Sequence, residues 1–470
     1  MTTHRPDEDP FLSFWLRVRE FAVPPSMIET ATARRRTGDW AGACAAAGID
    51  VDFTPRALAR TYGRELAARV RADLRHLAPD LLRWHMPRIA PRGLLRPGLT
   101  IALARYDSEP RPGTARAPAT VHLVARTPPA WADAGQRISL GLWDGTGPGT
   151  VRLHPHPYPS RRFRLDLHRH LWDARSAGDL HIRSGGSEGD DDSGLRLPPG
   201  RRCAVGRWAA EAALLLDAAG RTSGSVTVRL GGRHRLLLHA TAEGRLRFAD
   251  ARTAAARSPL VLPDAATWAL PDLELLRCGV IEADRLHPLV AAALAPGHAP
   301  AGPPPAPAGP GHPRVVDCRG APHRIGLVDG VLSALDHDPA EIRREELLVA
   351  LTGTPLPCLR AIDEAHRRPD CLTGVRERLD HGDIAGALAV VEGLLGPGAQ
   401  LRDGPLRDEL ETAALRRITY GLYRADLIEP GPSTCYPVTP PAPARRTRPR
   451  RTRPRRTRPR RTRPRRAGAR

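Results

Sequence analysis

The sequence of 470 residues contains neither lysine nor asparagine. All 72 basic residues are therefore arginines. A P-loop needs a lysine at the β- and γ-phosphates, a Schiff-base enzyme needs a lysine amine, and a typical protein kinase needs its strand lysine. The composition excludes these three classes of enzyme. Its abundance of Arg, Ala, Pro and Gly indicates a very GC-rich coding sequence and predicts a high-GC bacterial source.

Aromatic residues are also scarce, at 4% of the chain, while hydrophobic residues make up 41%. The cores are therefore expected to consist mainly of Leu, Val and Ala. The cysteines are scattered, odd in number and never spaced as C-x-x-C, so they signal neither a zinc pair nor a redox pair. We expect them to be small buried side chains in a reducing cytosol. They are Cys44, Cys203, Cys278, Cys318, Cys358, Cys371 and Cys435.

Long apolar runs are missing as well. Because no run of about 18 apolar residues occurs, no transmembrane helix is predicted. The N-terminus carries Arg5, Asp7 and Glu8 before the short apolar run 11–16. This is not the pattern of a signal peptide. The sequence therefore predicts a soluble cytoplasmic protein with no membrane partner.

The formal charge of +21 comes mostly from residues 445–470, which hold 15 arginines and no acid. Without this tail the chain has 57 basic and 51 acidic residues. Four copies of Arg-Arg-Thr-Arg-Pro predict an extended, disordered segment. It either binds RNA or DNA phosphates without sequence preference, or it is a repeat expansion without a selected role. The candidate nucleic-acid-binding residues are Arg445, Arg446, Arg448, Arg450, Arg451, Arg453, Arg455, Arg456, Arg458, Arg460, Arg461, Arg463, Arg465 and Arg466.

The rest of the chain predicts a multidomain α+β protein. Leu66, Val70 and Leu74 follow one another at helical spacing. Four segments after residue 93 alternate apolar and polar residues with a period of two, which predicts antiparallel strands at 99–106, 120–127, 136–143 and 162–167. Two glycines, Gly231 and Gly232, predict a tight hairpin between 226–230 and 233–240.

The second half is divided by a linker with eight prolines in the eighteen positions 296–313. Short strands are predicted after it, within 314–336. Helices are then predicted at 339–353, 356–367, 374–380, 384–395 and 405–424, the last with Leu406, Leu410, Ala414 and Ile418 along one face. The complete prediction is a flexible N-terminus (1–23), a helical unit (24–92), a β-rich domain (93–260), a helical segment (261–295), the linker (296–313), a C-terminal strand-then-helix α+β domain (314–430) and a disordered Pro- and Arg-rich tail (431–470).

A group of histidines is the strongest metal-binding candidate in the sequence. A His-x-His pair on a strand places both imidazoles on one face, where they can ligate a metal. Here one pair lies in a Pro-rich loop, and no defined metal-site spacing is present, so hydrogen-bonded or solvated histidines are the preferred explanation of the group. The weak candidate ligands are His154, His156, Asp166, His168, His170 and His181. No cofactor is predicted.

A short motif, Gly-Asp-x-Ala-Gly-Ala, occurs at 38–43 and again at 382–387. It resembles the start of the second helix in tetratricopeptide-type hairpins, where small residues allow helices to pack closely. The 34-residue period of that family is absent. Two separate helix–turn–helix corners that are capped in the same way are the alternative interpretation.

Three functions follow from these observations. Helical hairpins build surfaces for protein partners more often than active sites, so the first hypothesis is a non-catalytic scaffold or adaptor. The second is a nucleic-acid-associated protein that uses its arginine-rich tail. The third is a metal-dependent enzyme that uses the histidine region 154–181. The absence of any recognisable catalytic motif favours a protein that is not an enzyme.

Overall fold

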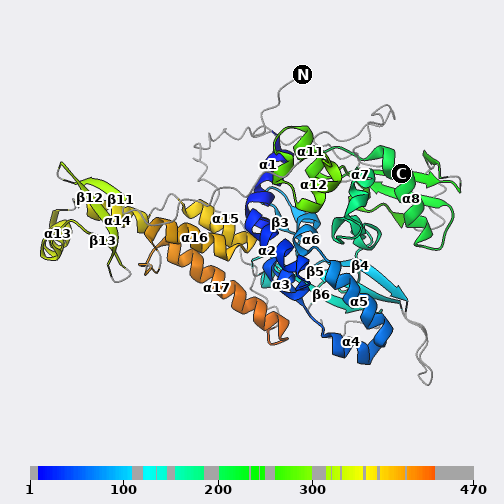
Figure 1. The fold of residues 1–470 in the computed structure, drawn as a ribbon, viewed down its shortest axis with the longest axis horizontal. Coiled ribbons are helices and arrows are strands. Elements are labelled where there is room, and N and C mark those ends of the chain that lie inside the picture. Colours follow the sequence, from blue (N-terminus) through cyan, green and yellow to red (C-terminus); the bar gives the residue numbers. More distant parts are fainter. Residues whose placement is uncertain are drawn as a thin grey trace, which may run out of the picture. The chain divides into compact units, whose positions relative to one another are not determined.

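The computed structural model is a mixed α+β protein, which confirms the fold class predicted from the sequence (Figure 1). None of its helices in the described part of the chain has the length and apolar character needed to cross a membrane. The arginine tail and most of the Pro-rich linker lie outside the described residues. The structure describes residues 9–107, 120–133, 135–145, 154–184, 201–231, 234–242, 244–248, 260–298, 314–318, 320–328, 331–352, 356–367, 371–396, 398 and 400–428.

The chain begins with helices. They are α1 (Pro10–Arg17) with a π-helical turn (Val18–Ala22), α2 (Pro25–Arg36), α3 (Trp40–Ala46), α4 (Pro55–Tyr62), α5 (Arg64–His76) and α6 (Pro79–His85). In place of the loose start predicted from the sequence, α1 is packed into the main hydrophobic core through Leu12 and Trp15. A proline at the first helical position favours the start of α1, since its missing N–H needs no partner there. The N-terminal residues from Asp9 onward thus belong to the folded protein.

The first sheet has the strand order β1-β6-β5-β4, with β1 parallel to β6 and the other pairs antiparallel. Its strands are β1 (Ile49–Val51), β4 (Thr100–Asp107), β5 (Thr120–Arg126) and β6 (Ile138–Trp143), and the small hairpin β2 (Arg88–Ile89) and β3 (Leu94–Leu95) lies between β1 and β4 in the sequence. Three of the four predicted strands are confirmed. The fourth, 162–167, is wrong: Leu165–Leu167 forms a 3-10 turn, and only Arg164 bridges to the sheet, at Ala102.

A second sheet follows, in the order β10-β7-β8-β9. The hairpin predicted around Gly231 is confirmed, and Gly231 adopts the positive φ of 101° that such a turn requires. The predicted helical segment 261–295 is broken into short helices. The elements are α7 (Leu180–Arg183), α8 (Trp208–Asp217), β7 (Gly224–Arg229), β8 (Arg235–Ala240), β9 (Leu246–Phe248), β10 (Leu260–Val261), α10 (Asp264–Thr267), α11 (Pro271–Arg277) and α12 (Pro288–Leu294).

Residues 314–428, which we call the C-terminal module, have a hydrophobic core of their own. The antiparallel sheet β11-β12-β13 comes first, and helices follow, as predicted. The elements are β11 (Arg314–Cys318), β12 (Ala321–Val328), β13 (Val331–Ala334), α13 (Pro339–Thr352), α14 (Pro357–Arg367), α15 (Leu372–His381), α16 (Ile384–Leu395) and α17 (Pro405–Arg424).

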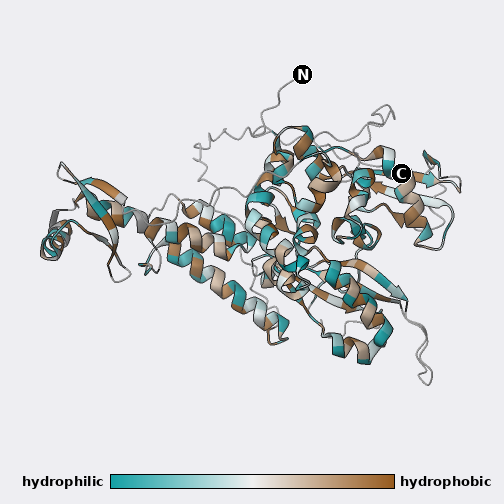
Figure 2. Ribbon diagram, viewed as in Figure 1, coloured by the Kyte–Doolittle hydropathy of each residue, from teal (hydrophilic) through white to brown (hydrophobic). Residues whose placement is uncertain are grey.

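The predicted apolar face of α17 is wrong in its second half. Leu406 and Leu410 contact the core, but Ala414 and Ile418 are exposed. Positions four apart advance by about 40° around a helix, so a series of i, i+4 steps winds away from the core. The buried face continues instead through Ala413 and Tyr420, and Figure 2 shows apolar and polar residues interleaved along the helix.

The two Gly-Asp-x-Ala-Gly-Ala motifs form the same corner. Asp39 and Asp383 each accept a hydrogen bond from the backbone N–H three residues later, at 2.8 and 2.9 Å. Each also binds the arginine five residues earlier, Arg34 or Arg378, at 2.8 Å. The preceding glycines, Gly38 and Gly382, have positive φ angles, as expected of a residue that ends a helix. The repeat therefore encodes a capped turn between two helices.

The guanidinium of Arg83 joins the C-terminal module to the helices before it. This side chain is 1% exposed. It donates hydrogen bonds to the carbonyl oxygens of Ala22, Gln136 and His381, at 2.9, 2.6 and 2.8 Å. A further bond to Ala47 measures 3.4 Å. These carbonyls lie at the end of the π-helical turn, just after α3, just before β6 and at the end of α15. One buried cation therefore fixes the C-terminal end of α15 against the N-terminal helices.

Candidate metal centre

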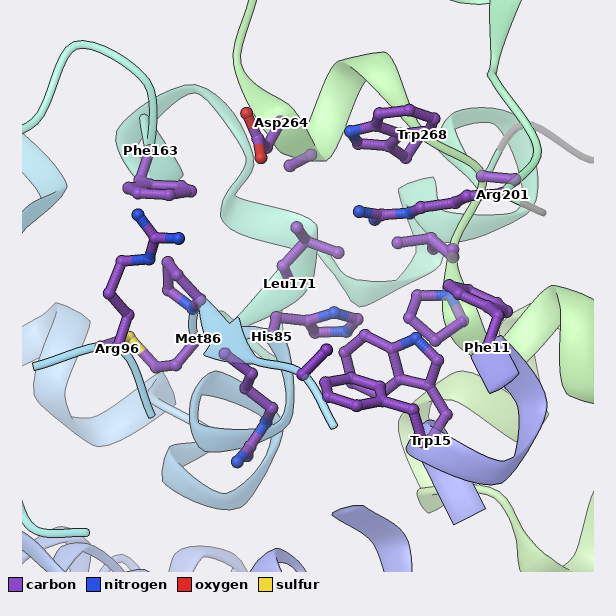
Figure 3. A pocket seen from close by; sticks show the side chains of 18 of the residues that line it. Phe11, Trp15, His85, Met86, Arg96, Phe163, Leu171, Arg201, Asp264 and Trp268 are labelled. Atoms are coloured by element: carbon purple, nitrogen blue, oxygen red, sulfur yellow. The ribbon is translucent and has the colours of Figure 1, made fainter. Parts of the chain in front are cut away.

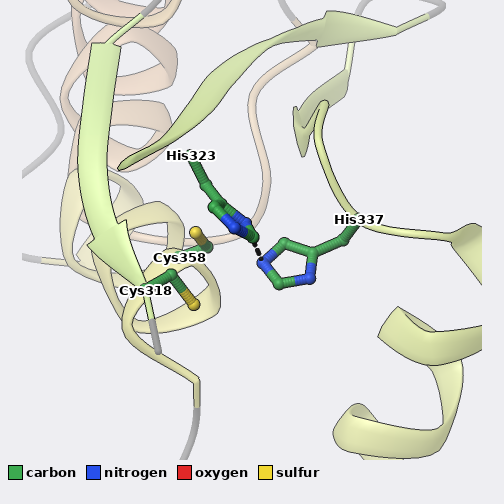
Figure 4. Close-up of side chains that lie close together, drawn as sticks. All are labelled: Cys318, His323, His337 and Cys358. Carbon is green, nitrogen blue, oxygen red and sulfur yellow. Dashed lines mark hydrogen bonds between the residues drawn. The ribbon is translucent and has the colours of Figure 1, made fainter. Parts of the chain in front are cut away.

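Four potential metal ligands meet in the C-terminal module: Cys318, His323, His337 and Cys358 (Figure 4). Each offers one sulfur or nitrogen atom, and these atoms all lie within 4.8 Å of one another. Among the described residues this is the one group of three or more His, Cys, Asp or Glu side chains that meets this condition. The group is therefore the candidate functional site.

The first two ligands are placed by the β11–β12 hairpin. Cys318 pairs with Ala321, and Val316 pairs with His323. Paired residues point to the same side of a sheet, and so do residues two apart on one strand. The thiol of Cys318 and the imidazole of His323 therefore share one face, as diagonal neighbours.

The other two ligands come from the segments that cover this face. His337 lies between β13 and α13, where Asp338 then accepts a hydrogen bond from the backbone N–H of Ala340, at 2.9 Å. Cys358 is the second residue of α14, directly after Pro357. The free N–H groups at a helix N-terminus favour negative charge, which suits a thiolate there. Four separate elements thus each contribute one ligand.

The set of ligands suits a tetrahedral zinc ion. Zn–S bonds of about 2.3 Å and Zn–N bonds of about 2.0–2.1 Å place the ligand atoms of such a site roughly 3.3–3.8 Å apart. The Nδ1 atom of His323 lies 2.8 Å from Nε2 of His337, at hydrogen-bond distance, and the ring centroids are 4.3 Å apart. The two nitrogens therefore have to separate by roughly 0.5 Å to ligate one ion. Two thiols with two imidazoles form the Cys2His2 set of structural zinc sites. Carboxylate oxygen, which Mg²⁺ and Ca²⁺ prefer, is not among these four ligands.

One carboxylate, that of Glu341, contacts the ligand His337. Nδ1 of His337 lies 3.4 Å from Oε2 of Glu341, one helical turn further on. An imidazole that binds a metal through one nitrogen usually donates its other N–H to such a group, which fixes the ring. Nε2 of His337 is therefore the nitrogen that faces the ion.

The two thiols lie in an apolar environment. Both Cys318 and Cys358 are 0% exposed, and they belong to the module's core beside Ile325 and Leu356. Burial is the main reason why the pKa of Cys358 rises to about 12, and the neighbouring Cys318 thiol raises it further. A bound divalent cation reverses this, since a coordinating thiol loses its proton outright. The site therefore favours a doubly charged cation over two buried thiolates alone.

The histidines highlighted by the sequence lie elsewhere. Buried His154 contacts the carbonyl oxygen of Thr127 at 3.0 Å, and exposed His181 contacts that of Gly178 at 2.6 Å. His156 is exposed. The remaining candidate outside the His168–His170 pair is Asp166, which forms a two-point ion pair with Arg164.

His168 and His170 are buried with ring centroids 5.7 Å apart. Nε2 of His168 lies 3.1 Å from Glu211, whose carboxylate also binds Arg183 and Arg207. These partners hold the pKa of Glu211 well below its usual range, even though burial raises it. In the described chain, no three of the six predicted ligands approach one another closely enough to share an ion.

Sequence reasoning missed the Cys2His2 group because its spacing is irregular. The intervals are five, fourteen and twenty-one residues, and they span three strands and two helices. The signals present were a cysteine before a Gly-containing turn, a histidine two residues into the next strand, and His337 before a helix start. The arginine tail, the candidate for nucleic acid, lies outside the described residues and stays a prediction.

The chain was compared with known proteins at three levels. No protein-family description, no curated protein and no solved structure matches it. The metal centre is therefore the feature on which a functional interpretation rests.

Proposed function

We propose that this protein is a non-catalytic scaffold or adaptor whose C-terminal module is held together by a structural zinc ion. The closed Cys2His2 group carries the proposal. Four protein ligands complete the coordination of zinc and leave no open position for water or substrate, unlike a catalytic zinc site. The ligands also lie under apolar side chains of the module's core. A zinc ion there stabilises the module without taking part in a reaction.

Zinc has a definite structural task in this module. The sheet has only three strands, and α14 packs against all of them. One ion would join β11, β12, the β13–α13 connection and α14 at a single point. Small domains that cannot bury enough apolar surface often depend on such an ion for folding.

The outer side of α17 supports the adaptor role. Leu415, Ile418 and Leu422 are 64%, 60% and 36% exposed. Their spacing places them on one stripe of the helix, about opposite the buried Leu406 and Tyr420. Contiguous exposed apolar side chains are typical of protein-binding surfaces. The amphipathic hairpins predicted from the sequence thus present an apolar face in addition to the one that they bury.

Metal analysis of the untagged full-length protein tests the zinc site. We expect close to one zinc per chain after purification without added metal, and almost none in a Cys318→Ser, Cys358→Ser double variant. The exposed Cys278→Ser variant is the matched control and should keep its zinc. Zinc content well below one per chain in all three proteins would contradict the proposal.

Co-purification from cells that express the protein natively tests the adaptor role. The wild type and Thr412→Arg, an exposed control on α17, should enrich the same proteins after nuclease treatment. Leu415→Arg combined with Ile418→Arg should lose them. A chain ending at Glu429 should keep its protein partners, whereas nucleic acid lost with the tail would support the tail hypothesis instead. The adaptor role fails if no protein is enriched, or if the double variant retains every partner.

A further inference from the structure

A second site lies between α1, α6 and α10, far from the metal ligands in sequence. It is a cavity of about 430 Å³, within the range of pockets that bind small molecules. We call it the α1 pocket, because Phe11, Phe14 and Trp15 of α1 form one wall. Met86, Leu171 and other apolar side chains form much of the rest (Figure 3).

Four polar side chains of this pocket carry a buried nitrogen without a hydrogen-bond partner among the described residues. These nitrogens are Nε1 of Trp15, Nε2 of His85, Nε of Arg88 and Nε of Arg201. Trp15 is only 8% exposed. Buried donors are nearly always satisfied in folded proteins, and an unsatisfied one is destabilising. Three N–H donors and one imidazole nitrogen, which donates or accepts according to its tautomer, lie around one cavity and indicate that an acceptor belongs there.

The charge of the side chains that line the cavity also indicates that an acceptor belongs there. Five arginines and one carboxylate, Asp264, line the cavity. Arg162 holds Asp264 in a two-point ion pair, with distances of 2.6 and 2.7 Å, and Arg164 holds Asp166 in the same way. These two pairs leave three arginines without a carboxylate partner in the described part of the chain. They are Arg88, Arg96 and Arg201.

Arg201 is held in position by aromatic rings, and none of the carboxylates among the described residues forms an ion pair with it. Its guanidinium carbon lies 4.6 Å from the centre of the Trp268 ring and 5.8 Å from that of Phe11. These distances are typical of cation–π contacts, which orient a guanidinium without neutralising it. Burial lowers the pKa of Arg201 to about 10. The side chain therefore remains charged at neutral pH and keeps an unused donor.

Arg88 and Arg96 extend the cationic lining. Nη1 and Nη2 of Arg88 donate to the carbonyl oxygens of Gly93 and Arg83, at 2.8 and 2.6 Å, so Nε is the donor left over. In Figure 3 the guanidinium groups of Arg96 and Arg201 lie on opposite sides of the pocket, with His85 and Trp15 lower in the view. Burial lowers the pKa of His85 to about 3, so its ring is neutral and adds a hydrogen-bonding group rather than charge.

We propose that the α1 pocket binds a small anion built on a flat aromatic ring, with its carboxylate or phosphate group at Arg201 and its ring against Trp15 and Met86. The anion supplies the acceptors that the orphaned donors lack, and the ring covers the apolar wall. This activity goes beyond the proposed zinc-dependent adaptor role, because none of the metal ligands lines the cavity.

Calorimetric titration of the full-length protein tests this assignment. One arm uses 2-naphthoate with its neutral amide as control, and the other uses AMP with adenosine as control. We expect at least one anion to bind roughly tenfold more tightly than its uncharged partner, since a charged group contributes about that much or more at a buried cationic site. The arm in which this happens identifies the carboxylate or the phosphate as the preferred group.

Variants connect binding to the named residues. Arg201→Gln should weaken the bound anion at least tenfold, while Arg202→Gln is the matched control and should not, because Arg202 faces Glu274 at 3.8 Å and does not line the pocket. Trp15→Phe keeps an aromatic side chain at this position but replaces the bicyclic indole, with its Nε1–H, by a smaller phenyl ring. This variant should weaken binding several-fold. It keeps the proposal testable if Arg201→Gln fails to fold.

Three results would overturn the proposal. The first is that neither anion binds with a Kd below about 1 mM. The second is that both anions bind no better than their neutral partners. The third is that the affinity is unchanged in both pocket variants.

Discussion

The metal centre and the α1 pocket are both clusters of nitrogen or sulfur atoms under apolar side chains, but their polar atoms differ in how they are satisfied. At the metal centre the ligands face one another, and a carboxylate orients His337 from behind. In the α1 pocket the donors surround an open volume and have no partners in the described chain. A closed set serves stability, whereas an open set stores binding capacity at the expense of stability.

Two buried arginines show the same difference. Arg83 donates to four backbone carbonyls and holds four segments together. Arg201 rests between two aromatic rings with an unused Nε. Burial is the main cause that lowers the pKa of each to about 10. What separates them is whether the protein itself provides the acceptors.

The largest expected effect comes from removing a zinc ligand. Cys358→Ser should unfold the C-terminal module, because structural zinc binding supplies on the order of 10 kcal/mol of folding free energy in small domains. Limited proteolysis should then cleave within 314–428 and leave the N-terminal helices and sheets protected. Cys278→Ser, at an exposed cysteine, should behave like the wild type. Unchanged protection of the module in Cys358→Ser would break the comparison, because the site would then not be a structural one.

The second largest effect is expected at Arg83, whose guanidinium donates hydrogen bonds to backbone carbonyls. Arg83→Met should lower the free energy of unfolding by about 3–5 kcal/mol, since it leaves buried carbonyls without donors and separates α15 from the N-terminal helices. Urea unfolding followed by far-UV circular dichroism measures the change. Arg71→Met, on the exposed side of α5, should stay within about 0.5 kcal/mol of the wild type. Equal effects of the two substitutions would mean that the Arg83 contacts contribute little.

A smaller effect is expected at the carboxylate behind the metal ligands. Glu341→Gln should weaken zinc about tenfold, because an acceptor that orients a ligating imidazole typically contributes ten- to a hundredfold in affinity. Competition with a chromogenic chelator measures the affinity directly. Glu364→Gln, at an exposed position of α14, is the control. Should both variants bind zinc as the wild type does, the 3.4 Å contact has no role in orienting His337.

The sequence predicted the helices and strands around the metal centre and the α1 pocket better than it predicted the two sites themselves. Local signals were sufficient for the hairpin at Gly231, for α17 and for the caps at Asp39 and Asp383, since each depends on residues within one turn. The strand β1 was missed because three residues carry too little periodicity, and 162–167 alternates without entering a sheet. Propensity describes a segment, while pairing depends on a partner that is far away in the sequence.

The two sites escaped prediction for the same reason. The metal ligands are brought together by a hairpin register and by a helix that packs on it, and neither is visible in the spacing. The α1 pocket combines α1, the end of α6, the residues before α8 and α10. The histidine group was prominent because its members are close in sequence, yet Glu211 and backbone carbonyls engage several of them separately. Closeness in sequence is therefore poor evidence for a shared ligand.

The smallest expected effect is that of replacing Arg201, and it distinguishes Arg201 from Arg83 most clearly. Arg201→Met removes a buried cation that lacks a carboxylate partner in the described chain, and it keeps an apolar side chain of similar length between Trp268 and Phe11. Such replacements are often neutral or stabilising. We expect the melting temperature to rise by about 1–3 °C without ligand, given the usual 2–4 °C per kcal/mol for domains of 150–250 residues, while binding of the aromatic anion is lost. Differential scanning calorimetry of the full-length protein measures the shift, with Arg202→Met as control. A fall of several degrees would place Arg201 with Arg83 among the structural arginines, because only a side chain that the folded state needs destabilises the protein when it is replaced by an apolar one of its own size.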